Sequence, residues 1–309
     1  GLGDVYKRQV FAHPEQVANT RKGKGFAFMK TINIGDVTVP IVGMGTWYLG
    51  EGNAEQSARE TQALKYGLDH GLRVIDTAEM YGNGAAETLI GSFLGDYPRA
   101  NIYLISKFYP SHADKKQMRT ALTNSLSRLK TDYLDLYLLH WRGATPLAET
   151  LEGLQELKKE GLIRQYGVSN FDVDDMDQLT LEPGGEQVVA NEVLYNLQSR
   201  GIDFDLLPRQ KQAGITTIGY SPYGSGSGKS IKLTPELTDL AKSKGISTHQ
   251  LLLAWVLRNG DVLSIPRTGE ASHMAENIAA ADVTFSPDEL DLFDQAFPMP
   301  RHHVPLEII

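Results

Sequence analysis

The chain has 309 residues, 41% of them hydrophobic and 22% charged, which is the composition of a globular protein long enough for one large core or two small ones. Its net charge of -8, without a basic cluster, argues against nucleic acid or an anionic membrane surface and favours a small-molecule partner. The absence of cysteine excludes disulfides and thiolate chemistry and fits a cytoplasmic location, and no apolar run reaches the roughly 18 residues of a membrane span.

Residues 1–28 show neither helical nor strand periodicity. We therefore exclude them from the fold as an extension that is disordered or artefactual, and we expect one domain over residues 29–309. That domain begins with two short strands, Thr31–Ile34 and Thr38–Ile41, whose separation by a Gly-Asp pair predicts a hairpin.

Strand-like and helix-like patterns then alternate to the end of the chain. Short apolar runs of the kind that form buried parallel strands are each followed by a stretch with helical periodicity. Eight such units predict an α/β fold, a closed (β/α)8 TIM barrel rather than an open doubly wound sheet. Two further helical stretches, Thr234–Gly245 and Thr248–Asn259, add to the helices expected in the C-terminal part. The predicted strands are Ile41–Trp47, Val74–Thr77, Ile102–Lys107, Leu134–His140, Gln165–Asn170, Val188–Glu192, Thr216–Ser221 and Val262–Pro266.

Ionisable residues stand at the ends of three of these strands. Asp76, Lys107 and His140 each close an apolar run, and Tyr81 follows Asp76 shortly afterwards. The carboxyl ends of barrel strands form one face, so we expect these four side chains to meet there as a catalytic set. Each has a structural alternative on its own: a buried ion pair between Asp76 and Lys107, a core imidazole, or a loop aromatic. Their joint occurrence in this order favours catalysis.

The four residues, together with Gly43–Trp47, Gly167–Asn170 and Ile265–Thr268, resemble the aldo-keto reductase family over about residues 29–297. The resemblance implies reduction of aldehydes and ketones to alcohols, with Tyr81 as the general acid. No side chain can supply hydride, so a nicotinamide cofactor is implied.

The chemistry of carbonyl reduction gives each of the other three residues a role. An ammonium group stabilises a nearby phenolate, so we expect Lys107 to lower the pKa of Tyr81. Asp76 would pair with Lys107 and hold it in place. His140 would donate a hydrogen bond to the carbonyl oxygen and stabilise the developing alkoxide.

The resemblance also implies cofactor-binding positions. Ser169 and Asn170 would bind the nicotinamide carboxamide, and Tyr220 would stack on the ring. Arg267 would face the 2′-phosphate of NADPH, which we therefore expect to be preferred over NADH by a modest factor. The full implied set is Gly45, Thr46, Trp47, Asp76, His140, Ser169, Asn170, Glu192, Tyr220, Ser221, Pro222, Tyr223, Ile265, Pro266, Arg267, Thr268, His273, Glu276 and Asn277.

Two positions depart from the family pattern. Glu192 stands where glutamine is common, and a carboxylate there can accept from the carboxamide nitrogen but adds negative charge. His273 stands where many NADPH-using members carry arginine. Imidazole is mostly neutral at neutral pH whereas guanidinium is always charged, so this second departure weakens selectivity for NADPH.

Aromatic residues near strand ends predict a largely apolar mouth that suits small carbonyl substrates. Ordinary packing of these aromatic side chains is the alternative, and the pattern leaves the physiological substrate open. The predicted substrate contacts are Trp47, Tyr48, Phe108 and Trp141.

Two local patterns suggest other sites and are set aside. Gly224–Ser230 resembles a phosphate-binding P-loop, but Tyr223 occupies a position that this motif reserves for glycine, so we expect a flexible flap over the cofactor. His302 and His303 invite a metal site, yet adjacent histidines cannot both point inward on a regular element. We expect no metal there, but a solvated tail or a wall of the substrate pocket.

Two other functions remain open. A non-catalytic, redox-sensing barrel subunit would bind NADP(H) without turnover, although the complete set of four residues disfavours it. A Schiff-base enzyme using Lys107 would be trapped by borohydride, but a lysine paired with Asp76 stays protonated and is not nucleophilic. We expect a monomer or a weak oligomer.

Overall fold

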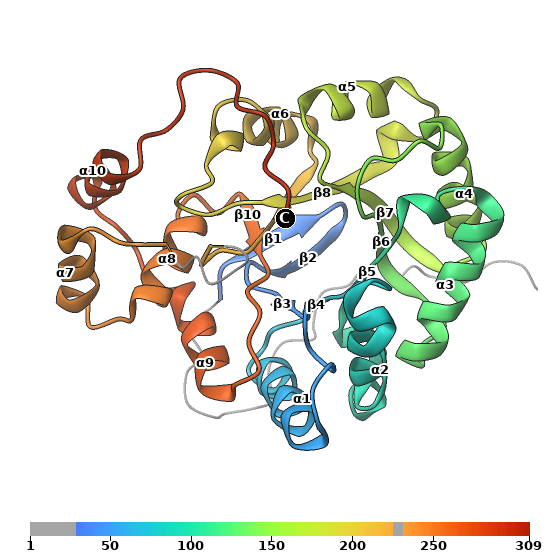
Figure 1. The fold of residues 1–309 in the computed structure, drawn as a ribbon, viewed down its shortest axis with the longest axis horizontal. Coiled ribbons are helices and arrows are strands. Elements are labelled where there is room, and N and C mark those ends of the chain that lie inside the picture. Colours follow the sequence, from blue (N-terminus) through green and yellow to red (C-terminus); the bar gives the residue numbers. More distant parts are fainter. Residues whose placement is uncertain (1–28, 225–230) are drawn as a thin grey trace, which may run out of the picture.

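The computed structural model describes residues 29–224 and 231–309, so the expectations for residues 1–28 and for the flap at 225–230 lie outside the described residues. Eight parallel strands form one sheet in the order β10-β9-β8-β7-β6-β5-β4-β3, with helices packed around it (Figure 1). The strands are β3 (Met44–Gly45), β4 (Val74–Asp76), β5 (Tyr103–Phe108), β6 (Leu134–Leu139), β7 (Ile163–Ser169), β8 (Val188–Leu194), β9 (Thr216–Tyr220) and β10 (Val262–Ser264).

The two ends of this sheet meet, which makes it a barrel. Parallel bridges join Val42 to Ser264 and Gly45 to Arg267, and the Gly43 amide donates to the Ser264 carbonyl at 2.8 Å. A Cβ atom on Gly45 would lie 2.6 Å from a carbonyl oxygen of the facing strand, so this seam closes only around glycine. The predicted (β/α)8 barrel is confirmed.

The helices begin and end where local capping dictates. Asn53 accepts a hydrogen bond from the Gln56 amide at the start of α1, and Gly71, with φ of 95°, follows its end. Two helices, α7 and α8, lie between β9 and β10, as the two helical stretches there predicted. The helices are α1 (Ala54–Asp69), α2 (Ala85–Gly91), α3 (Lys115–Leu129), α4 (Leu147–Lys159), α5 (Val173–Leu181), α6 (Leu206–Ala213), α7 (Pro235–Ser243), α8 (Thr248–Val256), α9 (Ala271–Ala280) and α10 (Pro287–Ala296). Short 3-10 turns are η1 (Tyr81–Gly84), η2 (Leu94–Asp96), η3 (Arg99–Asn101), η4 (Pro110–His112), η5 (Gly185–Gln187) and η6 (Gly201–Asp203).

The hairpin of β1 (Thr31–Ile34) and β2 (Val37–Pro40) closes one end of the barrel. Its backbone carbonyls accept from side chains at or near the starts of barrel strands, from Gln165 to Ile34 at 3.2 Å and from Thr216 to Asn33 at 2.6 Å. The amino-terminal end of the barrel is therefore plugged. The opposite end, where the strands finish, is left for a site.

Side chains alternate along the strands between the barrel interior and the helices. In β5, Ile105 packs in the inner core, whereas Leu104 and Phe108 pack in the outer core beneath the helices. Within residues 29–224 and 231–309, no helix is long and apolar enough to cross a membrane.

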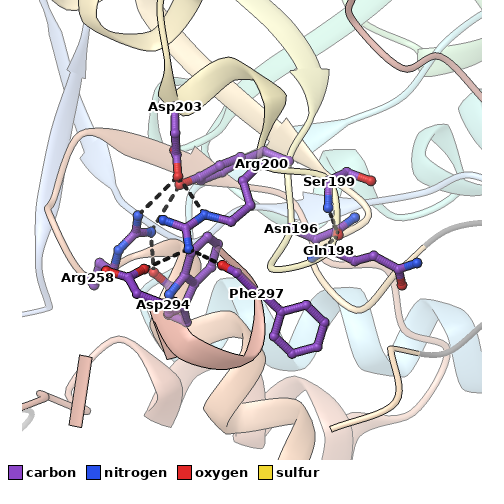
Figure 2. A network of polar contacts seen from close by, with 10 residues as sticks. Asn196, Gln198, Ser199, Arg200, Asp203, Arg258, Asp294 and Phe297 are labelled. Atoms are coloured by element: carbon purple, nitrogen blue, oxygen red, sulfur yellow. Dashed lines mark hydrogen bonds and ion pairs between the residues drawn. The ribbon is translucent and has the colours of Figure 1, made fainter. Parts of the chain in front are cut away.

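A polar network fastens the C-terminal helices to the loop after β8 (Figure 2). Arg200 pairs with Asp203 at 2.9 Å and with Asp294 of α10 at 2.7 Å, and it also donates to the Phe297 carbonyl. Arg258, just beyond α8, lies 3.6 Å from Asp203. Arg200 and Asp203 together thus join the loop after β8 to α10 and to the end of α8.

Candidate active site

The four predicted catalytic residues come together at the carboxyl end of the barrel. Lys107 Nζ, on β5, donates to Asp76 Oδ1 of β4 at 2.7 Å and to Tyr81 Oη at 3.0 Å. The Tyr81 ring meets the His140 ring edge-on, with centroids 5.8 Å apart. Lys107 is fully buried because strand alternation points it inward, as it does Ile105.

Glu192 joins this cluster from β8. Its Oε1 lies 3.3 Å from Lys107 Nζ, and the residue is 2% exposed. The carboxyl groups of Glu192 and Asp76 are also hydrogen-bonded to one another. The departure from glutamine therefore puts a second carboxyl group next to Lys107.

The protonation states follow from burial and from these neighbours. Burial and then the Asp76 carboxylate raise the pKa of Glu192 well above its ordinary value, against the opposing effect of Lys107. Burial lowers the pKa of Lys107, but Asp76 and Glu192 together hold it well above its ordinary value. Lys107 is consequently a cation at neutral pH.

Lys107 lowers the pKa of Tyr81, as expected, but the pKa as a whole lies above its ordinary value. Burial is the largest influence and raises the pKa of Tyr81; Lys107 lowers it, while Asp76 and Glu192 raise it further. Desolvation and two acidic neighbours outweigh one ammonium group. Tyr81 therefore holds its proton at neutral pH.

His140 is neutral. Burial, and then the positive charge of Lys107, lower the pKa of His140 to about 3. Its backbone carbonyl accepts from Asn170 Nδ2 at 3.0 Å, which fixes the loop after β6. Its Nδ1 is buried and has no hydrogen-bond partner among residues 29–224 and 231–309, so this ring nitrogen is available to a ligand.

A cavity of about 230 Å³ opens above this cluster. It brings together most of the residues predicted to bind the cofactor, and it adds Met80 and Ile309, which were not predicted, and Gly224, the first residue of the flap expected over the cofactor. Met80 directly precedes Tyr81, so its place in the sequence could have indicated it. The predicted residues in the wall are Gly45, Thr46, Trp47, Asp76, His140, Ser169, Asn170, Glu192, Tyr220, Ser221, Pro222, Tyr223, Ile265 and Arg267.

Three non-glycine residues in this wall have left-handed backbone conformations. The φ angles are 67° for Tyr48, 58° for Asn170 and 53° for Ser221. Such conformations cost free energy and concentrate at binding and catalytic sites, where the surrounding structure holds them.

The remaining cofactor positions lie beside the cavity. A neighbouring hollow of about 330 Å³ is lined by Arg267, Thr268 and His273, and also by Arg59 of α1, which was not predicted. Arg59 pairs with Glu55, four residues before it on the helix, and with Glu270. The spacing from Glu55 is that of an ordinary helical ion pair, so nothing in the sequence indicated a binding role. Three further predicted residues are engaged within the protein: the Pro266 carbonyl accepts from Gly45, Glu276 accepts from Ser247 and Asn277 accepts from Tyr223.

Two of the four predicted substrate contacts lie in the cavity wall and two do not. Trp47 and Tyr48 line the cavity with their rings stacked at 4.6 Å. Trp141 packs on His140 at 4.9 Å between ring centroids but is not part of the cavity wall. For Phe108 the prediction is wrong: the ring is fully buried against Tyr137, because strand alternation points it away from the side that carries Lys107.

The C-terminal tail reaches the same cavity. The Leu306 amide donates to Asp172 at 2.9 Å, and Ser199 donates to Glu307 at 2.7 Å. His303 is bound to Asp205 at 2.8 Å. Ile309 then lines the cavity, so the tail does contribute to the wall, but through an apolar residue rather than through the histidines.

The comparisons with known proteins agree with this geometry. The model of the aldo/keto reductase family matches residues 41–297. Methylglyoxal reductase YeaE of Escherichia coli is 42% identical over 277 residues, covering 89% of this chain and 97% of the relative. An aldo-keto reductase of Mycolicibacterium vanbaalenii is 31% identical, covering 84% and 88%.

Solved structures agree as well. An aldo/keto reductase from Klebsiella pneumoniae in complex with NADP and acetate superposes with a TM-score of 0.87 at 44% identity, covering 91% of this chain and all of that one. A thermostable aldo-keto reductase, Tm1743, superposes with a TM-score of 0.78 at 34% identity, covering 86% and 99%. The resemblance based on Asp76, Tyr81, Lys107 and His140 is confirmed: the chain belongs to the aldo/keto reductase family.

Proposed function

We propose that this chain reduces small aldehydes and ketones to alcohols with a nicotinamide dinucleotide as the hydride donor, NADPH being preferred. The observation that carries the proposal is the contact of Tyr81 Oη with Lys107 Nζ at 3.0 Å beneath the cavity. Two relatives support it, one named as a methylglyoxal reductase and one from Klebsiella pneumoniae crystallised with NADPH.

The residues around the cavity fit a dinucleotide. His140 Nδ1 and Asn277 Nδ2 are buried polar atoms without a partner among the described residues, and such atoms call for a polar ligand. Tyr220 offers a ring, and exposed Arg267 offers a cation to a phosphate. When bound, the nicotinamide would supply the hydride that no side chain can supply.

The chain's own groups would handle the proton. Tyr81, protonated at neutral pH, donates its proton to the carbonyl oxygen as that oxygen gains negative charge. Lys107 stabilises the resulting phenolate from 3.0 Å, and Asp76 holds Lys107 in place. Neutral His140 donates a hydrogen bond to the same carbonyl oxygen and orients it.

Turnover of a carbonyl panel tests this function. The panel holds methylglyoxal, 4-nitrobenzaldehyde and a keto-sugar, and NADPH or NADH oxidation is followed by absorbance. We expect Tyr81→Phe to lower kcat roughly 10²- to 10⁴-fold while cofactor binding, followed by fluorescence quenching, survives. The matched control is Tyr97→Phe, which removes a phenol that donates to Asp69 outside the cavity and should leave kcat unchanged.

The opposite result has a clear meaning. If the wild-type chain binds NADPH but turns over none of these carbonyls, the redox-sensing subunit becomes the better description. If Tyr81→Phe retains full turnover, the general acid is another group.

A further inference from the structure

Glu192 touches the Asp76, Lys107 and Tyr81 cluster, yet the proton transfer from Tyr81 described above does not use it. Its Oε1 lies 3.3 Å from Lys107 Nζ, and its carboxyl group is hydrogen-bonded to that of Asp76. The side chain is 2% exposed and forms part of the cavity wall. A buried titratable group in this place needs a chemical explanation.

The charges of the cluster do not balance if both carboxyl groups ionise. Asp76 and Glu192 share one ammonium group, that of Lys107, while His140 and Tyr81 are neutral. A second carboxylate without its own cation is costly in a desolvated site. Asp76 is the closer partner of Lys107, at 2.7 Å against 3.3 Å, so Asp76 is ionised and Glu192 carries the proton.

The groups that face Glu192 come from each strand or turn around it. They are Asp76 of β4, Tyr81 of η1, Lys107 of β5, His140 after β6 and Tyr220 of β9. Lys107 is the only cation among these five, and Arg267 is a second cation in the wall of the same cavity. A further positive charge inside the cavity would favour the ionised form of Glu192.

Carbonyl reduction creates such a charge. Hydride and proton must reach the same carbonyl group, so the nicotinamide ring must occupy the cavity that Tyr81, His140 and Glu192 line. That ring is neutral when reduced and a cation when oxidised. An opposite charge within a few ångströms lowers the pKa of a carboxyl group by about 1 to 3 units.

We propose that Glu192 is a proton-linked residue that keeps its proton in the free chain and with reduced cofactor, and releases it when oxidised cofactor occupies the cavity. This inference rests on the nicotinamide-dependent function proposed above. Glutamine, the residue common at this position in the family, could not perform this role because it does not titrate.

Glu192 also gives the buried cluster an internal source for the proton that Tyr81 loses. The Tyr81 O–H bond breaks as the O–H bond of the product alcohol forms. A Lys107 N–H bond then breaks to restore the Tyr81 phenol, across 3.0 Å. The Glu192 O–H bond breaks to restore the Lys107 ammonium, across 3.3 Å, and leaves a carboxylate. The loss of one proton from the cluster matches the positive charge gained by the oxidised ring.

Proton release on binding tests the proposal without turnover. The full chain is titrated calorimetrically with NADP+ and with NADPH, in phosphate and in Tris buffer at mildly alkaline pH. The difference between buffers gives the protons released per cofactor bound, and the 2′-phosphate contribution cancels between the two cofactors. We expect the wild-type chain to release about one proton more with NADP+ than with NADPH.

Two variants identify the group. Glu192→Gln should abolish the difference between the two cofactors. Glu79→Gln should preserve it, because the Glu79 carboxylate is near the barrel end but is bound to His112 and to the Tyr109 amide. Equal proton release by wild type with both cofactors, or a difference that persists in Glu192→Gln, would overturn the proposal.

A second measurement needs only the wild-type chain. The dissociation constants of NADP+ and NADPH are measured from mildly acidic to alkaline pH. We expect their ratio to shift in favour of NADP+ by up to roughly tenfold per pH unit over part of this range. A constant ratio, with normal turnover, would overturn the role of Glu192 and leave the reductase function intact. Failure of either cofactor to bind would overturn both.

Discussion

The ammonium nitrogen of Lys107 lies 3.0 Å from the phenolic oxygen of Tyr81, and both side chains are buried. Burial raises the pKa of Tyr81 despite this contact, so the phenol is held as a protonated acid. The same ammonium group is 2.7 Å from Asp76. Both the proposed chemistry and the stability of this end of the barrel depend on the charge of Lys107 being neutralised by this carboxylate.

Replacing Lys107 tests this neutralisation of charge through its effect on the unfolding free energy. Lys107→Met leaves the Asp76 and Glu192 carboxyl groups buried without a cation, and breaking such a buried pair costs about 3–5 kcal/mol of unfolding free energy. Lys65→Met removes an exposed pair with Asp96 and should cost less than about 1 kcal/mol. Urea unfolding followed by circular dichroism measures both values.

The same variant should depend on pH in a defined direction. Burial already raises the pKa of Asp76 against the opposing charge of Lys107, and without that charge the folded-state pKa rises further. A carboxyl group with a raised folded pKa stabilises the fold below its unfolded pKa and loses that contribution as pH rises through the folded value. Lys107→Met should therefore be most destabilised at alkaline pH. An equal loss at acid and alkaline pH would contradict the buried-carboxyl explanation.

The neutrality of His140 can be observed directly. Its folded pKa of about 3 lies below the ordinary 6.5, so the ring should stay uncharged through mildly acidic pH. His303 provides a reference in the same spectrum, because its hydrogen bond to Asp205 raises its pKa. Proton NMR of the ring resonances, assigned with His140→Gln, measures both titrations. A His140 titration near 6.5 would show that its desolvation is smaller than the structure implies.

His140 also links stability to pH. The unfolded chain takes up a proton near 6.5 whereas the folded ring resists until about 3, so unfolding becomes easier as pH falls through this window. Between pH 6.5 and about 3, the unfolding free energy of His140→Gln should fall less steeply than that of the wild-type chain. Thermal unfolding at several pH values compares the two chains.

Arg267 sets the expected preference for NADPH. It borders both the cavity and the neighbouring hollow, and a charge-assisted bond to a phosphate contributes about 1.5–3 kcal/mol. Arg267→Ala should raise the KM for NADPH roughly tenfold to a hundredfold, with little effect on NADH. His273→Arg should increase the preference for NADPH, because guanidinium keeps its charge at every working pH. Equal efficiency of the wild-type chain with both cofactors would contradict this assignment.

The network around Arg200 predicts that the two aspartates bound to its guanidinium contribute unequally to the unfolding free energy (Figure 2). Asp203 is buried and also accepts from Tyr195 at 2.7 Å, whereas the Asp294 side chain is 58% exposed. Asp203→Asn should lower the unfolding free energy by about 3 kcal/mol or more. Asp294→Asn should lower it by less than about 1 kcal/mol. Similar losses in the two variants would mean that burial does not decide the strength of this network.

Much of the barrel could be predicted because its information is local. Strand ends were marked by Asp76, Lys107 and His140 after short apolar runs, and the end of the first helix by Gly71. These signals occupy a few residues each, and a regular alternation of strands and helices leaves few ways to arrange them.

Other features depended on distances between residues far apart in the chain. The face of β5 that turns inward carries Lys107 into the cluster, whereas Phe108 points outward. No local signal in the sequence showed that Ile309 would reach the cavity. The sequence by itself determined the residue types, the order of the elements and the departure at Glu192. Only the tertiary structure decided that Glu192 would share Lys107 with Asp76, and that Tyr81 would hold its proton, because desolvation and charge interactions depend on separation in space.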